Sequence, residues 1–502
     1  MGLNAHISKR LLVSFAAWVS LAASGVSAPD WELVELRRQL TQLSDDVREE
    51  GDARARSVWE LAQNIDWPIP VEPDHPVPDA DMSAYSAQLG WTDFRVALAP
   101  MRQIYGAEND KQIHLALKDN PEALRIENGV ATLSGLRQHL THRHLTRDRK
   151  SGGSLLQVPL IVGPDATLRL GPEDRLVLNR SKGSFIINFG RLELYGAKVS
   201  ATETPNPHSD SFMPFITSVG SGSVHAVGAE LTGLGYGNTA KFSGFSVMAY
   251  PTMRPAGRTV IMDSQFDRLV TLSLVGVTAP ELRGNRFYSM RRNSLLVSRS
   301  AHVLLAGNLF AGDSPTNAIR VTNGSAGAKL IGNIILEGSR AGFLVASGSD
   351  GVVVRDNLIW RRNGGGVKLL STNCATVSGN LILDDKQKGV EVRSSQNAFV
   401  VANDIIGNHN AGVWVSAQGE GEVTYVTDNL LRENGSGLST AGGGALALSH
   451  NDMTNQFPRF LDGDLTHQFR EIINDLSGQN PILLSSAEVK PAKLLVPRNC
   501  AL

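Results

Sequence analysis

One stretch of the sequence, residues 293–308, reads NSLLVSRSAHVLLAGN. It holds two short aliphatic runs separated by a polar break, and it ends on Gly-Asn. Segments of the same form precede and follow it, and each ends on an asparagine at a spacing of 22 to 26 residues. These asparagines are Asn285, Asn308, Asn333, Asn357, Asn380, Asn403, Asn429 and Asn451. A sustained period of this length, with Val/Ile/Leu runs and Gly/Asn bends, predicts a right-handed parallel β-helix.

Each repeat is expected to form one coil of three short strands. A single coil cannot bury its apolar side chains alone, so coils stack about 4.8 Å apart and bond to one another. The recurring asparagines are expected to stack as a side-chain amide ladder and to adopt the left-handed backbone conformation of a tight bend. The main alternative, a leucine-rich repeat, requires Leu-x-x-Leu-x-Leu spacing and a helix in every repeat. The sequence contains neither feature.

The composition narrows the function classes. The chain has 502 residues, 49 of them Gly, and a formal net charge of −1 from 48 basic and 49 acidic residues. The chain has no excess of basic residues, so its charge gives no indication of a nucleic-acid partner. Two cysteines, Cys374 and Cys500, exclude a disulfide-dense scaffold. Whether they pair is left open, and Cys374 is expected to be a small core residue at the start of a strand. No His/Asp/Glu cluster has the spacing of metal ligands, and no cofactor is predicted.

The N-terminal residues have the features of a signal peptide. Residues 1–28 contain a basic start, an apolar run and the small-x-small site VSA. We therefore expect a secreted, periplasmic protein without a membrane span after cleavage, and an uncleaved N-terminal anchor is the alternative. The complete division that we predict is a signal peptide (1–28), a helical segment and Pro-rich linker (29–90), a small mixed region capping the solenoid (91–154), the β-helix (155–455) and a C-terminal tail (456–502).

Two local predictions concern the region before the repeats. Residues 31–65 place leucines at spacings of three and four, which predicts an amphipathic helix or helix pair lying on another surface. A coiled-coil contact with a partner is the alternative. Within the capping region, Asn128-Gly129 predicts a turn between a short strand and a helix.

In each coil, the strand before the asparagine-containing bends exposes its third and fifth residues if alternation holds. The third positions are Leu296, Arg320, Leu344, Lys368, Glu391 and Trp414, and the fifth are Ser298, Thr322, Ala346, Leu370, Arg393 and Ser416. Arg320, Lys368, Arg393 and Trp414 are the predicted substrate-binding residues, because cations beside an aromatic ring suit a polymer of sugar acids. An ordinary solvated sheet face with scattered charges is the alternative.

A more specific segment, residues 234–269, reads LGYGNTAKFSGFSVMAYPTMRPAGRTVIMDSQFDRL. It resembles the periplasmic mannuronan C5-epimerase family of alginate biosynthesis, which has an LGY segment, a Pro-rich insertion and then a first regular coil. The resemblance extends over about two-thirds of the chain and is most distinctive from 205 to 290. It implies a β-helix that binds polymannuronate in the periplasm and inverts C5 to give guluronate, as part of an export assembly.

Epimerisation at C5 requires a cation that neutralises the carboxylate, a base that removes the proton and an acid that returns one to the opposite face. The family places an Asp-Pro-His-Asp motif, followed by Arg-Ser, in the coil of residues 293–308. Here the matching residues are Leu295–Ser298, followed by Arg299-Ser300. Two further family pairs, Ser-Arg and Asp-Arg, become Thr322-Asn323 and Ala346-Ser347. The catalytic candidates that remain are Tyr236, Arg299 and His302.

We therefore predict an epimerase-like protein that acts on or binds an anionic, uronate-containing exopolysaccharide during its synthesis or export. One alternative is a catalytically inactive β-helix that serves in polysaccharide binding or assembly. A polysaccharide lyase is another, because it shares the first half of the chemistry. The last is a structural or host-contact β-helix without a glycan ligand.

Overall fold

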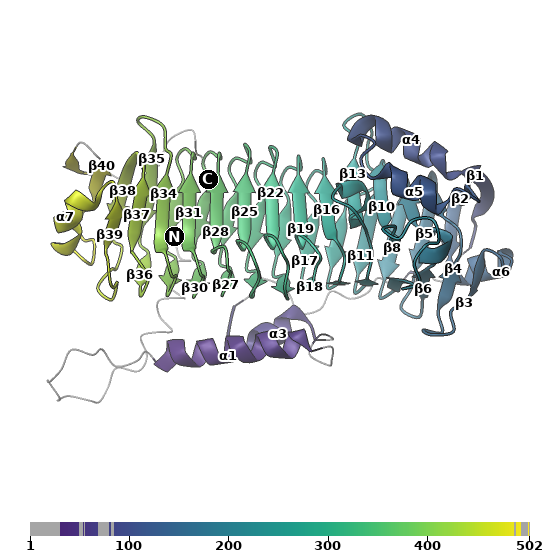
Figure 1. Ribbon diagram of the computed structural model, residues 1–502, viewed down its shortest axis with the longest axis horizontal. Helices are drawn as coiled ribbons and strands as arrows, with labels where there is room; N and C mark the ends of the chain where they lie inside the picture. The colour runs from purple at the N-terminus through teal and green to yellow at the C-terminus, as the bar shows by residue number, and fades with distance from the viewer. Residues whose placement is uncertain are drawn as a thin grey trace.

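The computed structural model describes residues 31–49, 54, 56–68, 80–81, 85–485, 488–492 and 500. The predicted signal peptide and most of the predicted linker lie outside these residues. The described chain forms an elongated parallel β-helix whose coils lie side by side along one axis (Figure 1). The predicted fold class is thus confirmed together with its N-terminal helical segment, and the leucine-rich alternative is excluded.

Each regular coil contributes one strand to each of three columns, and strands within a column pair in parallel. The first column contains β7 (Ile186–Asn188), β10 (Ile216–Gly220), β13 (Gly244–Ala249), β16 (Thr271–Val275), β19 (Leu295–Ser298), β22 (Ile319–Thr322), β25 (Phe343–Ala346), β28 (Val367–Leu370), β31 (Lys388–Arg393), β34 (Ala411–Ser416), β37 (Leu438–Ala441) and β39 (Leu461–Gly463). The second contains β8 (Arg191–Tyr195), β11 (Ser223–Val227), β14 (Val260–Met262), β17 (Glu281–Arg283), β20 (Leu304–Ala306), β23 (Lys329–Ile331), β26 (Val353–Arg355), β29 (Thr376–Ser378), β32 (Phe399–Val401), β35 (Val423–Thr427) and β38 (Ala445–Ser449). The third contains β4 (Ser154–Leu156), β6 (Arg175–Leu178), β9 (Lys198–Ala201), β12 (Glu230–Thr232), β15 (Gln265–Asp267), β18 (Arg286–Tyr288), β21 (Leu309–Ala311), β24 (Ile334–Ile335), β27 (Leu358–Trp360), β30 (Leu381–Leu383), β33 (Asp404–Ile406) and β36 (Leu430–Arg432).

Alternation along the strands fills the interior with apolar side chains. The residue two after each ladder asparagine is at most 1% exposed in the coils from Phe287 to Leu431. At the upstream end of this row, Phe266, Phe287 and Phe310 stack with ring centroids 5.1 and 4.6 Å apart. One side chain from each coil therefore contacts its equivalents in the coils on either side, as the sequence pattern predicts.

The predicted asparagine ladder is present. Asn357 donates its Nδ2 hydrogen to Asn380 Oδ1 over 2.9 Å, and its own Oδ1 accepts from the backbone N and the Nδ2 of Asn333 at 2.8 and 2.9 Å. The same pattern links the buried amides from Asn285 to Asn451. Each amide thus joins two neighbouring coils.

The prediction that these asparagines adopt the left-handed conformation was wrong. Positive φ angles occur instead at the residue before each asparagine, which are Gly284, Gly307, Gly332, Asp356, Gly379, Ala402, Asp428 and His450. The residue before each asparagine adopts the left-handed conformation at the bend. The asparagine itself can therefore form the ladder hydrogen bonds to the next coil.

A second ladder runs through the bend after the third column. Asn408 Nδ2 donates to Asn434 Oδ1 over 2.9 Å, and Asn434 Nδ2 donates to Gln456 Oε1 over 3.1 Å. Asp385 occupies the preceding position, where its Oδ1 accepts from the backbone N of Arg362 over 2.6 Å. Its buried Oδ2 has no hydrogen-bond partner within the described part of the chain. Burial raises the pKa of Asp385 from 3.8 to about 8.

Helix α1 (Trp31–Arg48) packs along the outer face of the third column (Figure 1). Leu40, Leu43 and Val47 are buried in one cluster with side chains of β21, β24, β27 and β30. Arg37 Nη2 lies 2.7 Å from Asp384 Oδ1 and fixes the helix against the coils. The prediction of an amphipathic helix lying on a surface is confirmed, and α3 (Val58–Gln63) joins the same cluster.

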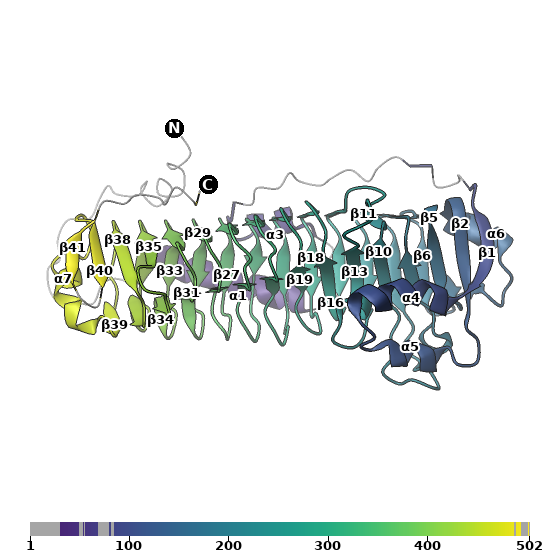
Figure 2. The same ribbon diagram turned by 90° about the horizontal axis from the view of Figure 1, so that it is seen from above.

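One end of the solenoid is closed by a mixed cap. There, β1 (Gln88–Asp93) pairs antiparallel with β2 (Glu122–Thr132), which pairs in parallel with β5 (Leu160–Leu170). Helices α4 (Phe94–Tyr105) and α5 (Asp110–Ala116) lie over the outer face of the first column (Figure 2). No described helix is both long enough and apolar enough to cross a membrane.

An ion pair attaches the cap to the coils. Lys241, 1% exposed, forms an ion pair with Asp110 at the start of α5 and so joins the cap to the coils.

The predicted turn at Asn128-Gly129 was wrong, because β2 continues through these residues with a bulge and Gly129 has φ +76°. Helix α6 (Leu133–His139) then follows directly.

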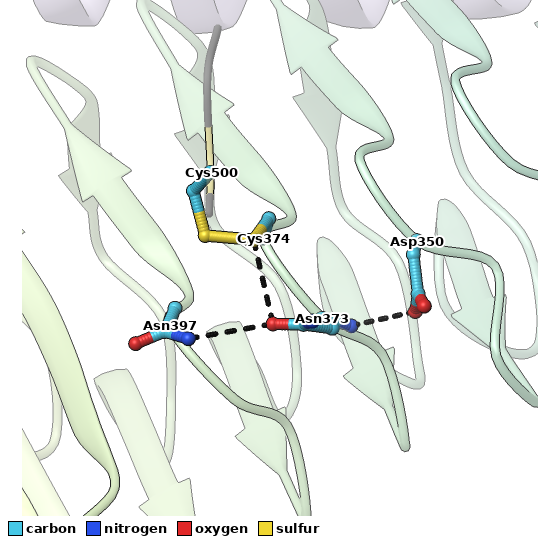
Figure 3. The surroundings of a disulfide bond; sticks show 5 residues. All are labelled: Asp350, Asn373, Cys374, Asn397 and Cys500. Carbon is cyan, nitrogen blue, oxygen red and sulfur yellow. Dashed lines mark hydrogen bonds between the residues drawn. A yellow bond between two sulfur atoms is a disulfide. The ribbon is translucent and has the colours of Figure 1, made fainter. Parts of the chain in front are cut away.

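The other end is closed by β40 (Ile482–Ser485), which pairs antiparallel with β38, and by β41 (Val489–Pro491) and α7 (Phe469–Ile473). Beyond them, Cys500 forms a disulfide with Cys374 and fixes the end of the chain to the middle of the solenoid (Figure 3). The prediction that Cys374 is a core residue at the start of a strand was wrong, since it is partly exposed and lies in the bend between β28 and β29 with φ +53°.

The ladder makes Asn357→Ala a destabilising substitution. It removes the Oδ1 that accepts twice from Asn333 and leaves buried polar groups in both neighbouring coils unpaired. We expect the free energy of unfolding to fall by about 3 kcal/mol or more, measured by urea denaturation. Asn363, exposed in the same coil, is the control, and Asn363→Ala should change stability by less than about 0.5 kcal/mol. Equal losses would show that the ladder does not stabilise the fold.

The raised pKa of Asp385 should make the stability of the fold depend on pH. Between pH 4 and pH 8 the carboxyl is protonated in the folded chain and ionised in the unfolded chain, so folding takes up a proton. Stability should therefore fall as the pH rises through this window, by up to about 1.4 kcal/mol per unit. Asp385→Asn supplies a neutral amide of the same shape and should raise the melting temperature at pH 8 but hardly at pH 4. A variant with an unchanged pH profile would contradict the prediction.

Candidate functional site

The predicted outward residues of the first column lie in two straight rows. The second row is at least partly exposed only at Leu370 and Arg393, and the prediction that its other members face solvent was wrong, because Ser298, Thr322, Ala346 and Ser416 are at most 7% exposed. Strand pairing places Leu296 beside Arg320, Arg320 beside Leu344 and, further along, Lys368 beside Glu391 and Glu391 beside Trp414. The second row includes Leu370, Arg393 and Ser416 on adjacent strands. We call the outer surface of the first column from β19 to β37 the first-column face.

Cations dominate the middle of this face. Arg320 and Arg393 are exposed, and neither has an ion-pair partner among the described residues. Lys368 Nζ lies 3.2 Å from Glu391 Oε1, while Lys388 Nζ lies 3.5 Å from Glu391 Oε2. With four cations and one carboxylate, the net charge of this group is +3.

Trp414 forms a platform beside these charges. Its ring is partly exposed, and Lys388 Nζ lies 4.3 Å from the ring centroid. Lys388 was not predicted from the sequence, because it stands at the start of β31 before regular alternation begins. An aromatic ring with an attached cation can hold a pyranose ring by stacking while the cation meets an acidic group.

The cap covers the first column upstream of β19 and so forms the upstream border of the first-column face. Helix α4 brings Tyr105 next to Tyr250, with ring centroids 5.9 Å apart, and the guanidinium carbon of Arg299 lies 5.8 Å from the Tyr105 centroid. Tyr105 Oη donates to the Ala249 carbonyl over 2.7 Å. Burial raises the pKa of Tyr105 to about 12, against the opposing effect of Arg299, so the phenol remains protonated at neutral pH. Tyr105 was not predicted from the sequence, because no short-range pattern connects α4 with the coils.

The three catalytic candidates do not come together. Tyr236 is 4% exposed, stacks on Phe242 with centroids 5.2 Å apart, and donates its hydroxyl to the Asn109 carbonyl over 3.4 Å. Burial raises its pKa well above the usual value. His302 lies at a coil corner with φ +54°, and Arg299 alone borders the first-column face.

The residues at the motif positions offer no proton-transfer group. Leu295 and Val297 point into the core, Leu296 points outward, and Ser298 Oγ accepts from Asn323 Nδ2 over 3.0 Å. Across the described residues, no three His, Cys, Asp or Glu side chains are placed to hold a metal ion.

Comparison with known proteins agrees with this architecture. A sequence model described as "Right handed beta helix region" matches residues 271–431 and 317–461. A crystal structure of the periplasmic alginate epimerase AlgG matches with a TM-score of 0.59 and 19% identity, covering 78% of this chain and 99% of that chain. The chain shares the fold of this epimerase.

Two variants of AlgG match the chain as well. Their TM-scores are 0.61 and 0.59, each is 18% identical, and they cover 78% of this chain and 98% and 100% of their own. A search of curated protein sequences found no significant match. At this identity the likeness to AlgG establishes the fold alone.

Proposed function

We propose that this protein binds an anionic polysaccharide built from uronate residues along the first-column face, in the periplasm and in association with the export of that polymer. The observation that carries the proposal is the in-register row of Arg320, Lys368 and Trp414, with Arg393 in the adjacent row, on a fold shared with an alginate epimerase. A periplasmic location is the expectation from the N-terminal sequence and is supported by the neighbour's location.

The geometry of the solenoid suits an extended polymer. Strands in a column repeat about every 4.8 Å, so the seven strands from β19 to β37 span roughly 29 Å. This repeat is close to the length of one sugar ring in an extended chain, so carboxylates along the polymer can meet the cations of β22, β28 and β31, while β25 contributes Leu344 and no cation. Arginine pairs with carboxylate through two parallel hydrogen bonds, which makes Arg320 and Arg393 the strongest contacts.

The side chains favour binding over catalysis. Removal of the C5 proton needs a base within hydrogen-bond reach, and Leu295–Ser298 supply none. Polymer binding does not require proton-transfer groups at positions 295–298, because the cations and Trp414 lie on other strands of the first-column face. An inactive polysaccharide-binding or assembly protein is therefore the version of the function that we propose first.

Epimerisation at a rearranged site is the second candidate. The arrangement of Arg299 over Tyr105 favours it, since a cation beside a protonated phenol can neutralise a carboxylate and return a proton to C5. A base is still required. The same half-reaction followed by loss of the 4-O substituent would be a lyase reaction.

Binding should depend on the charged row. With polymannuronate in a calorimetric titration, Arg320→Gln and Arg393→Gln should each weaken binding several-fold, and Trp414→Ala about tenfold because it removes the stacking platform. Raising the ionic strength should weaken binding further. Arg355, exposed on the second column, is the matched control, and Arg355→Gln should bind normally. If no uronate polymer binds, the glycan proposal fails.

Catalysis is tested in deuterated water. The purified protein is incubated with polymannuronate, and C5 is followed by NMR. For a binding protein we expect no deuterium at C5 and no change in the polymer. Deuterium at C5 with inverted stereochemistry would identify an epimerase, and Tyr105→Phe should then lower its rate. An unsaturated non-reducing end would identify a lyase.

A further inference from the structure

A second group of polar side chains lies on a different face of the solenoid, next to the cap. Strand β8 of the second column pairs with β5 on one side and with β11 on the other, and this pairing places Arg169, Glu193 and His225 in one outward row. Arg191 and Tyr195 flank Glu193 on β8, two residues away on either side. Five polar side chains therefore project from three neighbouring strands.

The acidic member of this group is already neutralised. Arg169 Nε lies 2.7 Å from Glu193 Oε2, and both side chains are largely buried, at 19% and 11% exposure. Arg169 also donates Nη1 to the Asp81 carbonyl over 3.1 Å. With Arg191 included, two cations and one carboxylate leave a net charge of +1, and the excess resides on the exposed Arg191.

Tyr195 and His225 form the second pair. Tyr195 is 4% exposed, and its Oη lies 3.0 Å from His225 Nδ1, with the rings edge to face. Burial, followed by the charge of Glu193, raises the pKa of Tyr195, so the phenol keeps its proton. His225 is the only described partner of that hydroxyl. Donation to Nδ1 therefore avoids a buried, unpaired O–H.

This assignment determines what His225 presents to solvent. A neutral imidazole has one donor and one acceptor nitrogen, so an Nδ1 that accepts from Tyr195 leaves the proton on Nε2. No described residue hydrogen-bonds to Nε2, and His225 is half-exposed. The outer edge of His225 is therefore a hydrogen-bond donor.

The loop between β13 and β14 borders this surface. It projects beside β11 (Figure 2), and its Ala256 carbonyl accepts from Arg191 Nη2 over 3.1 Å. That single contact orients the guanidinium and leaves its other N–H groups available. Gly257 lies against Ser223 and Arg191, where an added Cβ would meet the Ser223 hydroxyl at 3.4 Å. The loop thus holds the Arg191 guanidinium on the side of β8 that faces β11, where Arg191 pairs with Ser223, two residues before His225.

We propose that Arg191 and His225 form a carboxylate-binding site for a single sugar-acid residue, separate from the first-column face. Arg191 binds the carboxylate, His225 Nε2–H donates to a carboxylate or ring-hydroxyl oxygen, and Tyr195 is a positioning residue that sets the histidine tautomer. The groups available to a ligand on Arg191 and His225 are donors, which suits an anionic oxygen. The choice of a sugar acid rests on the proposed function, whereas carboxylate recognition rests on this geometry alone.

Histidine side-chain NMR tests the site in the full chain. In ¹⁵N-histidine-labelled protein, the resonance lost in His225→Gln identifies His225 and should report the Nε2–H tautomer. Added trimannuronate should shift this resonance, and neutral mannotriose should not. Arg191→Gln should weaken the response about tenfold, while Arg393→Gln on the first-column face should leave it unchanged. Tyr195→Phe should alter the tautomer and weaken binding with Arg191 intact.

The outcomes separate this site from the proposed function. If trimannuronate does not shift the His225 resonance while polymannuronate still binds through Arg320 and Arg393, the proposal of a second site is wrong and the proposed function stands. If mannotriose shifts His225 equally, carboxylate recognition is wrong. If His225 responds as expected but substitutions on the first-column face have no effect on polymer binding, the proposed function fails and the second site stands. Unchanged melting temperatures would confirm that the variants are folded.

Discussion

The hydrogen bond between one buried asparagine side chain and the next fixes each coil against its neighbours. Every such amide has backbone and side-chain partners in adjacent coils, so a coil that slipped by one residue would leave several buried polar groups unpaired. The same slip would move each strand's apolar residues from the interior to solvent. The straight rows on the outer faces depend on this register, because Arg320, Lys368 and Trp414 align only if their strands do.

The cap and α1 determine which outer faces a ligand can reach. Helix α1 occupies part of the third column, and α4 and α5 cover the upstream part of the first column. The first-column face is therefore bounded at its upstream end, where Tyr105 and Arg299 meet. A polymer lying along the rows must stop or turn away at that cluster, which gives the face a polarity that a bare solenoid lacks.

The sequence was most informative where a property repeats. One asparagine per coil revealed the period, and alternation from that reference correctly assigned Arg320, Lys368 and Trp414 to one row. It was uninformative where partners are distant in the chain, as for Tyr105 with Arg299, or Cys374 with Cys500. Asp385 was not predicted for another reason. It belongs to the second ladder, where Asp385, Asn408, Asn434 and Gln456 occupy equivalent positions, so no single residue type marks this bend in the sequence. Burial explains why Asp385 fits there as a neutral group.

Binding and proton transfer place different demands on this scaffold. Contacts between a polymer and a row of cations are spread over several coils, so the loss of one leaves the others in place. Proton transfer requires a base, an acid and a cation within about 3 Å of one sugar atom, so a single missing group abolishes it. Leu295–Ser298 provide no such groups, yet the ladder and the core are continuous through this coil, since Leu295 and Val297 fill interior positions of β19. The β-helix fold therefore does not depend on proton-transfer groups at these positions.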